Sequence, residues 1–177
     1  MINTKYSIDY SDWFDEGGYC QVYPIKGEKD LVFKEFRNKK KAQKSYNYQK
    51  KLAKFDLAPK IYSTICKLEF AKEEGVYQPE PSDWGYITEL AKTYKPASKI
   101  TMNNIQDLVD DIKNKTGLKF WDCHWFNVGV VKRGKKQKVV CIDTGEESFD
   151  GNSNAWGFAE PGPKCCYCEK YQCKCSS

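Results

Sequence analysis

The chain has 177 residues, of which 40% are hydrophobic and 15% aromatic, and its formal net charge at pH 7 is +5. This composition excludes a disordered chain, and the length suits one domain with its own hydrophobic core. No run of 18 consecutive apolar residues is present and the first residues lack an apolar leader segment, so we expect neither a helical membrane span nor a secretory signal. We therefore expect a cytoplasmic protein whose thiols stay reduced, with no membrane partner.

The basic residues gather in two segments, NKKKAQKSYNYQKK at 38–51 and VKRGKKQK at 131–138. Such clusters occur on surfaces that bind nucleic acid, nucleotide phosphates or acidic partners, and also on solvated helix faces and hairpin tips. No known nucleic-acid-binding motif accompanies them. The sequence therefore favours solvated surfaces, and nucleic acid is not an expected partner.

Residues 6–36 alternate between apolar and polar side chains and are interrupted by turn residues, which predicts three antiparallel strands. The expected turns are Glu16–Gly18 and Gly27–Asp30. A helical stripe follows, with Asn38 as the expected N-cap and Pro59 as the expected end. Its members are Ala42, Tyr46, Gln49, Leu52 and Ala53.

The second half of the chain predicts two more strands, a helix and a hairpin. The strands are expected at 60–71 and 84–91, and the helix follows Thr101, its expected N-cap, and ends at Gly117. Its apolar stripe is Ile105, Leu108, Val109 and Ile112. The hairpin joins VGVV to KVVCI through RGKK. The order predicts an α+β protein, with a five-stranded antiparallel sheet and one helix followed by a mostly helical second lobe.

The segment GLKFWDCHWFNVGVV contains the only histidine of the chain, His124, between Asp122 and Asn127. A carboxylate at Asp122 can accept a proton from an attacking hydroxyl. The hairpin that follows Asn127 returns to VVCIDTG, which brings Asp143 back beside it. An amide oxygen and a carboxylate are ligands that Mg²⁺ prefers, so Asn127 and Asp143 are candidate metal ligands.

These motifs, in this order, resemble the protein-kinase-like fold over roughly residues 14–147. FDEGGYCQVY is similar to the glycine-rich loop above the nucleotide phosphates, LVFKEF to the strand with the phosphate-binding lysine, and YITELA to the hinge. The resemblance implies backbone hydrogen bonds to adenine from the hinge and a back wall for the pocket from its threonine. The implied ATP-binding residues are Gly17, Gly18, Val22, Lys34, Thr88, Glu89 and Ala91.

DCHWFN resembles the catalytic loop of aminoglycoside, choline and related small-molecule kinases, in which a histidine stands two residues after the aspartate. By this resemblance Asp122 is the catalytic base and His124 contacts the γ-phosphate or steadies the loop. Asn127 and Asp143 hold Mg²⁺ or Mn²⁺.

The chain departs from the kinase pattern in four places. No acidic residue stands between Glu35 and Asp56, although active protein kinases pair the lysine with a helix glutamate, and the register suggests Ser45 or Gln49 there. Only 34 residues follow Asp143, a size similar to reduced kinase-like proteins of phages, viruses and bacterial effectors. The other departures are Asp15 and Cys20 in place of the outer glycines, and Phe120 and Trp121 before the catalytic aspartate.

The chain has nine cysteines, of which five lie in KCCYCEKYQCKC near the C-terminus. Cys165-x2-Cys168 and Cys173-x-Cys175 offer four thiolates, the number that tetrahedral Zn²⁺ takes. The spacer between these pairs is shorter than in ordinary zinc ribbons, so a zinc site and a metal-free tail remain alternatives. The remaining cysteines are expected in the core: Cys20, Cys66, Cys123 and Cys141.

We therefore expect a two-lobed kinase-like domain at 1–160 and a Cys-rich tail at 161–177. The N-lobe is expected at about 1–91, the hinge at about 89–96 and a strongly truncated C-lobe at about 97–160. The expected function is ATP- and Mg²⁺-dependent phosphotransfer to a hydroxyl of a protein or small molecule, with nucleotidyl transfer left open. The alternatives are a weak or inactive pseudokinase that binds nucleotide or a partner and, less favoured, a zinc-tailed basic module that binds nucleic acid. A viral or phage protein of this kind would act in the host cytoplasm.

Overall fold

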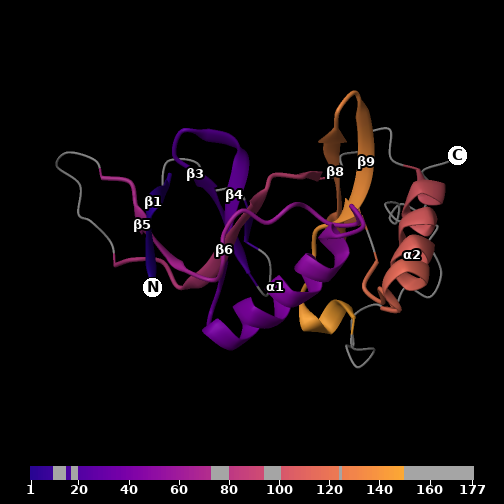
Figure 1. The fold of residues 1–177 in the computed structure, drawn as a ribbon, viewed down its shortest axis with the longest axis horizontal. Coiled ribbons are helices and arrows are strands. Elements are labelled where there is room, and N and C mark those ends of the chain that lie inside the picture. Colours follow the sequence, from indigo (N-terminus) through magenta and orange to yellow (C-terminus); the bar gives the residue numbers. More distant parts are fainter. Residues whose placement is uncertain (10–14, 17–19, 73–79, 94–100, 124, 150–177) are drawn as a thin grey trace, which may run out of the picture. The chain divides into compact units, whose positions relative to one another are not determined.

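The computed structural model describes residues 1–9, 15–16, 20–72, 80–93, 101–123 and 125–149 (Figure 1). The chain divides into two compact units. The first comprises Met1–Ala53 and Pro59–Leu90, and the second comprises Lys54–Ala58 and the residues from Ala91 onward. Both units contain a sheet and a helix, which confirms the α+β class. No helix among the described residues is long and apolar enough to cross a membrane.

The first unit is built on a sheet whose strands follow the order β5-β1-β3-β4-β6, with the short β2 paired to β3. β1 runs parallel to β5, so the expectation of a purely antiparallel sheet is wrong for this pair. The strands predicted for residues 6–36 include only the last residues of β1, and a parallel pairing with the distant segment Lys67–Phe70 leaves no local signal in the sequence. The strands are β1 Ile2–Ile8, β2 Asp15–Glu16, β3 Gln21–Ile25, β4 Glu28–Phe36, β5 Lys67–Phe70 and β6 Trp84–Glu89.

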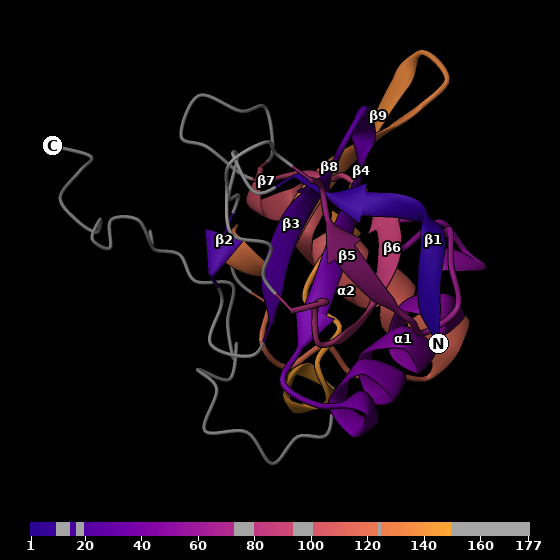
Figure 2. The same ribbon diagram turned by 90° about the vertical axis from the view of Figure 1, so that its left-hand side faces the viewer.

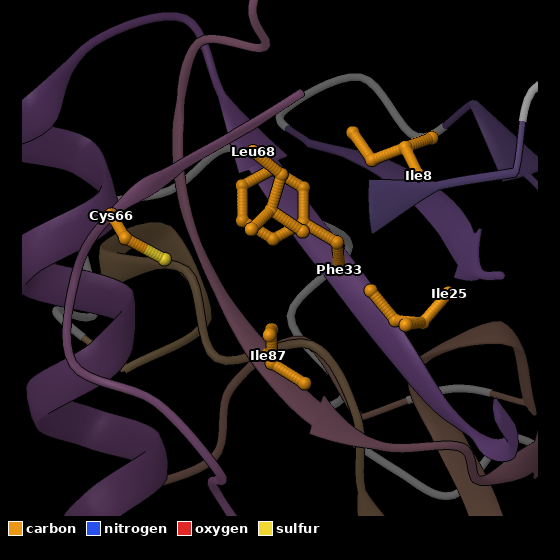
Figure 3. Packing of buried hydrophobic residues seen from close by; sticks show 6 residues of the cluster. All are labelled: Ile8, Ile25, Phe33, Cys66, Leu68 and Ile87. Carbon is orange, nitrogen blue, oxygen red and sulfur yellow. The ribbon is translucent and has the colours of Figure 1, made fainter. Parts of the chain in front are cut away.

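The two ends of this sheet path also meet. An isolated antiparallel bridge joins Cys66 to Gly85, with both backbone N–H···O distances at 2.9 Å, so the strands close on themselves (Figure 2). Gly85 is required at the contact, because a Cβ there would overlap the carbonyl oxygen of Lys34. Closure pairs the edge strands that would otherwise be open to other chains. The enclosed core contains Ile8, Ile25, Phe33, Cys66, Leu68 and Ile87 (Figure 3).

α1, Lys39–Ala53, lies against β4 and β6. The Asn38 side chain accepts a hydrogen bond from the backbone N–H of Lys41 at 3.0 Å, which confirms the predicted N-cap. The helix ends before Pro59, the expected end, because the chain turns with Asp56 at a φ of 60°. Residues 54–58 then belong to the second unit, where the carbonyl of Leu57 accepts from the N–H of Cys141 at 2.9 Å.

The second unit pairs a three-stranded antiparallel sheet, in the order β7-β8-β9, with one α-helix. The expectation of a mostly helical second lobe is therefore wrong for the described residues. Thr101 and Asn104 form a capping box at the start of the helix, and Gly117 ends it at a φ of 73°, so both predicted caps are confirmed. The predicted hairpin is present as β8 and β9. The elements are β7 Lys92–Thr93, α2 Met102–Thr116, β8 Val128–Arg133, β9 Lys136–Cys141 and the 3₁₀ turns Trp125–Asn127 and Glu146–Ser148.

Candidate active site

The loop that follows α2 is fixed by aromatic stacking and by a backbone hydrogen bond. Phe120 is buried and stacks on Phe149, with ring centroids 5.4 Å apart. The N–H of Trp121 donates to the carbonyl of Ser148 at 2.9 Å. Two segments distant in sequence thus hold the residue that comes next, Asp122, on a supported loop.

Asp122 and Asn127 are joined directly. The Asn127 side-chain nitrogen Nδ2 donates to the Asp122 carboxylate oxygen Oδ2 and to the Asp122 carbonyl, both at 2.9 Å. The Asn127 carbonyl accepts from the N–H groups of Ile142, at 3.0 Å, and Asp143, at 3.4 Å. Three of the sequence-predicted site residues, Asp122, Asn127 and Asp143, therefore lie together where β8 begins and β9 ends.

The Asp143 carboxylate is oriented by two donors on the loop after β9. Oδ1 accepts from the N–H of Gly145 at 3.0 Å, and Oδ2 accepts from the hydroxyl of Ser148 at 2.9 Å. Ser148 is fully buried, so its hydroxyl is a fixed donor. Ser148 was not predicted from the sequence, since a serine five residues after an aspartate follows no recognisable motif. Each carboxylate oxygen has a second lone pair, so one donor per oxygen leaves room for a cation.

The chemistry of Asn127 and Asp143 fits Mg²⁺ better than a transition metal. Mg²⁺ keeps several waters and is usually bound through one or two protein carboxylates together with substrate phosphates. One carboxylate and one amide oxygen meet that requirement. Within the part of the chain that the structure describes, no group of three or more His, Cys, Asp or Glu side chains gathers to hold a metal by protein ligands alone.

Cys123, between Asp122 and the histidine, is a buried thiol rather than a nucleophile. Burial, aided by the negative charge of Asp122, raises the pKa of the Cys123 thiol to about 12. A thiol with this pKa is protonated at neutral pH and unreactive. Its part in the loop is packing.

Lys34, the predicted phosphate anchor, lies on β4 of the first unit and is only 7% exposed. It is the cross-strand partner of Val22 on β3 and of Tyr86 on β6. The ammonium nitrogen is 6.0 Å from the ring centre of Phe36. Lysines are almost never this buried on ordinary surfaces, so Lys34 is no exposed edge-strand residue.

A buried network of neutral side chains connects α1 to β6. The Tyr86 hydroxyl donates to Gln49 Oε1 at 2.9 Å and shares a 2.9 Å hydrogen bond with Ser45. Gln49 Nε2 donates to the Thr88 hydroxyl at 2.5 Å and to the carbonyl of Pro59 at 3.0 Å. The sequence register suggested Ser45 or Gln49 for the place of the kinase glutamate, and the structure buries both side chains against β6. Tyr86, the hydroxyl that connects them, was missed.

Thr88 and Glu89 at the end of β6 are both held by Lys60. The Thr88 hydroxyl donates to the Lys60 carbonyl at 2.9 Å, and the side chain is 2% exposed. The Glu89 backbone N–H donates to the same carbonyl at 2.8 Å, so this N–H already has a protein acceptor. Ala91 begins the second unit.

Other predicted residues lie outside the described part of the chain: Gly17, Gly18, His124, Cys165, Cys168, Cys173 and Cys175. The Cys-rich tail as a whole lies there too. Among the described cysteines, Cys66, Cys123 and Cys141 are buried as predicted, and Cys20 is partly buried.

Comparison with models of known protein families gave no match, and comparison with curated proteins gave no significant match. The chemistry of the residues themselves, rather than kinship, therefore carries the functional inference.

Proposed function

We propose that the chain is an ATP- and Mg²⁺-dependent phosphotransferase with a two-lobed, kinase-like fold and a reduced second lobe. The acceptor is a hydroxyl of a protein or small molecule. The observation that carries the proposal is the hydrogen-bonded pair Asp122–Asn127, set beside the strand end that bears Asp143. A carboxylate, an amide and a second carboxylate in this arrangement suit proton acceptance and magnesium binding.

We assign nucleotide recognition to the first unit. Lys34 supplies the positive charge for the α- and β-phosphates, and its burial strengthens that interaction because the surroundings are poorly solvated. Val22 and Thr88 contact the base. The Glu89 carbonyl and a backbone group of Ala91 bond its polar edge.

We assign proton acceptance and metal binding to the second unit. Asp122 takes the proton of the acceptor hydroxyl, whose oxygen forms the new bond to the γ-phosphorus. The bond from that phosphorus to the bridging oxygen breaks, and its electron pair stays on ADP. Asn127 and Asp143 hold the Mg²⁺ or Mn²⁺ that neutralises phosphate charge, and His124 assists at the γ-phosphate.

A second candidate, a pseudokinase that binds nucleotide or a partner without turnover, is favoured by one observation. The α1 residues buried against β6 are the neutral Ser45 and Gln49, engaged with Tyr86 and Thr88. A helix glutamate, the usual partner that orients the lysine, is missing from α1. Catalysis is the step that this absence weakens, because phosphoryl transfer depends on positioning.

The tail cysteines Cys165, Cys168, Cys173 and Cys175 are proposed as Zn²⁺ ligands that brace the short second lobe. Elemental analysis of protein purified without chelator tests this. One zinc per chain is expected, and no stoichiometric zinc would exclude it.

Thermal unfolding with ATP, with and without Mg²⁺, tests the metal–nucleotide site. A ligand that binds only the folded state raises the unfolding midpoint. We expect ATP with Mg²⁺ to raise it and Asp143→Asn to abolish the metal-dependent part. In this variant the amide oxygen still accepts from the Gly145 N–H, and the amide nitrogen can donate to the Ser148 hydroxyl oxygen. We therefore expect the fold to be retained. Asp111→Asn, which removes an exposed ion pair on α2, is the matched control and should behave as wild type.

Turnover separates the two candidates. Release of ADP with Mg²⁺-ATP, abolished by Asp122→Asn while the ATP-dependent midpoint shift persists, supports the phosphotransferase. A midpoint shift without ADP release supports the pseudokinase. No shift at millimolar ATP overturns both.

A further inference from the structure

The solvent face of α1 and its flanks concentrates the positive charge of the whole chain. Residues 36–55 contain eight basic side chains and no acidic one. The rest of the chain holds 21 basic and 24 acidic residues, a net charge of −3, so this segment alone makes the chain basic. The basic residues are Arg37, Lys39, Lys40, Lys41, Lys44, Lys50, Lys51 and Lys54.

The helix sorts its residues sharply between two faces. Its buried positions, on the side of β4 and β6, are Ala42, Ser45, Gln49 and Leu52 (Figure 1). Every exposed position of α1 is a lysine, a glutamine or an asparagine. One stripe at i, i+4, i+7 and i+11 carries Lys40, Lys44, Asn47 and Lys51, and a parallel stripe carries Lys39, Gln43 and Lys50. This lysine face is continuous along the 15 residues of the helix, about 22 Å.

The lysine face works against the stability of its own helix. Lys39, Lys40 and Lys41 occupy the first turn, where the helix dipole favours negative charge, and no acidic residue lies in that turn. Lys40 and Lys44 are like charges at i and i+4. Natural helices usually interleave acidic residues to relieve such repulsion. Residues that destabilise their own helix, with no neighbouring residue to offset the effect, are expected at functional surfaces.

We propose that this lysine face binds the phosphodiester backbone of nucleic acid. Protein interfaces are depleted of lysine and depend on buried aromatic anchors, which the exposed face lacks. Stable docking on a lipid surface needs an apolar face to insert, and the apolar face of α1 is buried in the first unit. Lysines bind phosphates as point charges. The side-chain amides of Gln43 and Asn47 add hydrogen-bonding groups to the face, and they join its two stripes through a 3.0 Å hydrogen bond from Gln43 to Asn47. The face is separate from the residues of the proposed phosphotransfer.

Fluorescence anisotropy with a fluorescein-labelled 20-base-pair DNA duplex, from 50 to 200 mM NaCl, tests this face. The variant is Lys40→Gln/Lys44→Gln/Lys51→Gln. The matched control removes the same charge from exposed lysines elsewhere in the first unit, as Lys26→Gln/Lys29→Gln/Lys72→Gln. The slope of log K against log salt is negative, and each lost phosphate contact reduces its magnitude by about 0.9. The loss of three contacts therefore reduces the magnitude by about 2.7. We expect the variant to bind at least about tenfold more weakly at 100 mM NaCl.

The control triple variant should retain the wild-type slope within about one contact. Equal weakening by both triple variants, or no salt-dependent binding by the wild type, would overturn the proposal. Binding to phosphatidylserine vesicles that depends on the three lysines, without binding to the duplex, would overturn it in favour of a lipid surface. Glutamine and lysine have similar helix propensities, and circular dichroism checks that α1 persists. Asp143→Asn should bind the duplex as wild type does, which separates this face from the proposed ATP site.

Discussion

Replacing Gln49 by leucine removes the centre of the buried network between α1 and β6. The Gln49 side chain is fully buried and makes three hydrogen bonds, to Tyr86, Thr88 and the Pro59 carbonyl. Leucine has nearly the same size and the same helix propensity, so the substitution deletes polar contacts with little change in packing.

The cost follows from which partners retain another hydrogen bond. The Tyr86 hydroxyl keeps Ser45, and the Thr88 hydroxyl still donates to the Lys60 carbonyl. The carbonyl of the buried Pro59 loses its donor, which costs about 1–3 kcal/mol, and the two weakened hydroxyls add about 1 kcal/mol. Leucine's more favourable transfer from water offsets about 1 kcal/mol of this cost. We expect the free energy of unfolding to fall by about 1–3 kcal/mol.

Urea denaturation followed by far-UV circular dichroism measures this change. With a slope of about 2 kcal/mol per molar, the midpoint should fall by about 0.5–1.5 M. Gln43→Leu is the matched control, since Gln43 is exposed on the same helix and its side-chain nitrogen donates to the exposed Asn47 at 3.0 Å. It should change stability by no more than about 0.5 kcal/mol. A loss below 1 kcal/mol for Gln49→Leu, or equal losses for both variants, would refute the network as a stabilising feature.

Three further outcomes follow from the buried polar groups. Burial raises the pKa of the Glu35 carboxyl above 4.5, so the folded state binds this proton more tightly than the unfolded state. The free energy of unfolding should therefore fall as pH rises from 4.5 through the raised pKa. Glu35→Gln keeps an acceptor for the Asp83 N–H, and urea titrations should show a weaker dependence of stability on pH for this variant. With its pKa at about 12 rather than 9.0, the Cys123 thiol should react with iodoacetamide at pH 8 about 1,000-fold more slowly than an exposed cysteine, and peptide mass mapping that finds comparable labelling would contradict its burial. Gln49→Glu should destabilise the fold more at pH 7 than at pH 5, because an ionised carboxylate cannot donate to Thr88 or to a carbonyl; wild-type stability at pH 7 would instead show that a cation compensates it.

Local signals in the sequence predicted most of the elements. Asn38, Thr101 and Gly117 were recognisable because a cap is decided by a few neighbouring residues. The β8–β9 hairpin was predicted from two short apolar runs on either side of a Gly-containing turn. Signals of this kind need no knowledge of distant parts of the chain.

The missed features depend on contacts between distant segments. β1 pairs in parallel with β5, which follows α1 in the sequence, so no local pattern predicts this pairing. The bridge between Cys66 and Gly85 joins residues whose closeness no local pattern encodes. The end of α1 at Ala53 is set by the turn at Asp56, which engages Arg133 at 2.7 Å, and no helix-end motif marks it.

The candidate site divides in the same way. The spacing of Asp122 and Asn127 and the hairpin that follows were enough to place Asp143 beside them, since a hairpin returns its chain by geometry. Ser148 and Tyr86 were not predictable, because a serine or tyrosine acquires its role only from the partner that burial brings to it.

The two groups of candidate residues are held by different means, and this bears on whether the protein turns over ATP. Lys34 lies in a closed sheet beside a buried network, so its surroundings change only at a cost of several hydrogen bonds. Asp122 lies on a short loop that also carries Phe126, whose side chain is 80% exposed. Nucleotide binding should therefore follow the stability of the first unit, whereas turnover should respond to loop substitutions that leave stability unchanged. If Gln49→Leu lowers ATP affinity and Asp122→Asn lowers only ADP release, the neutral network has taken over the lysine-orienting task of the missing glutamate, and the pseudokinase alternative loses its main support.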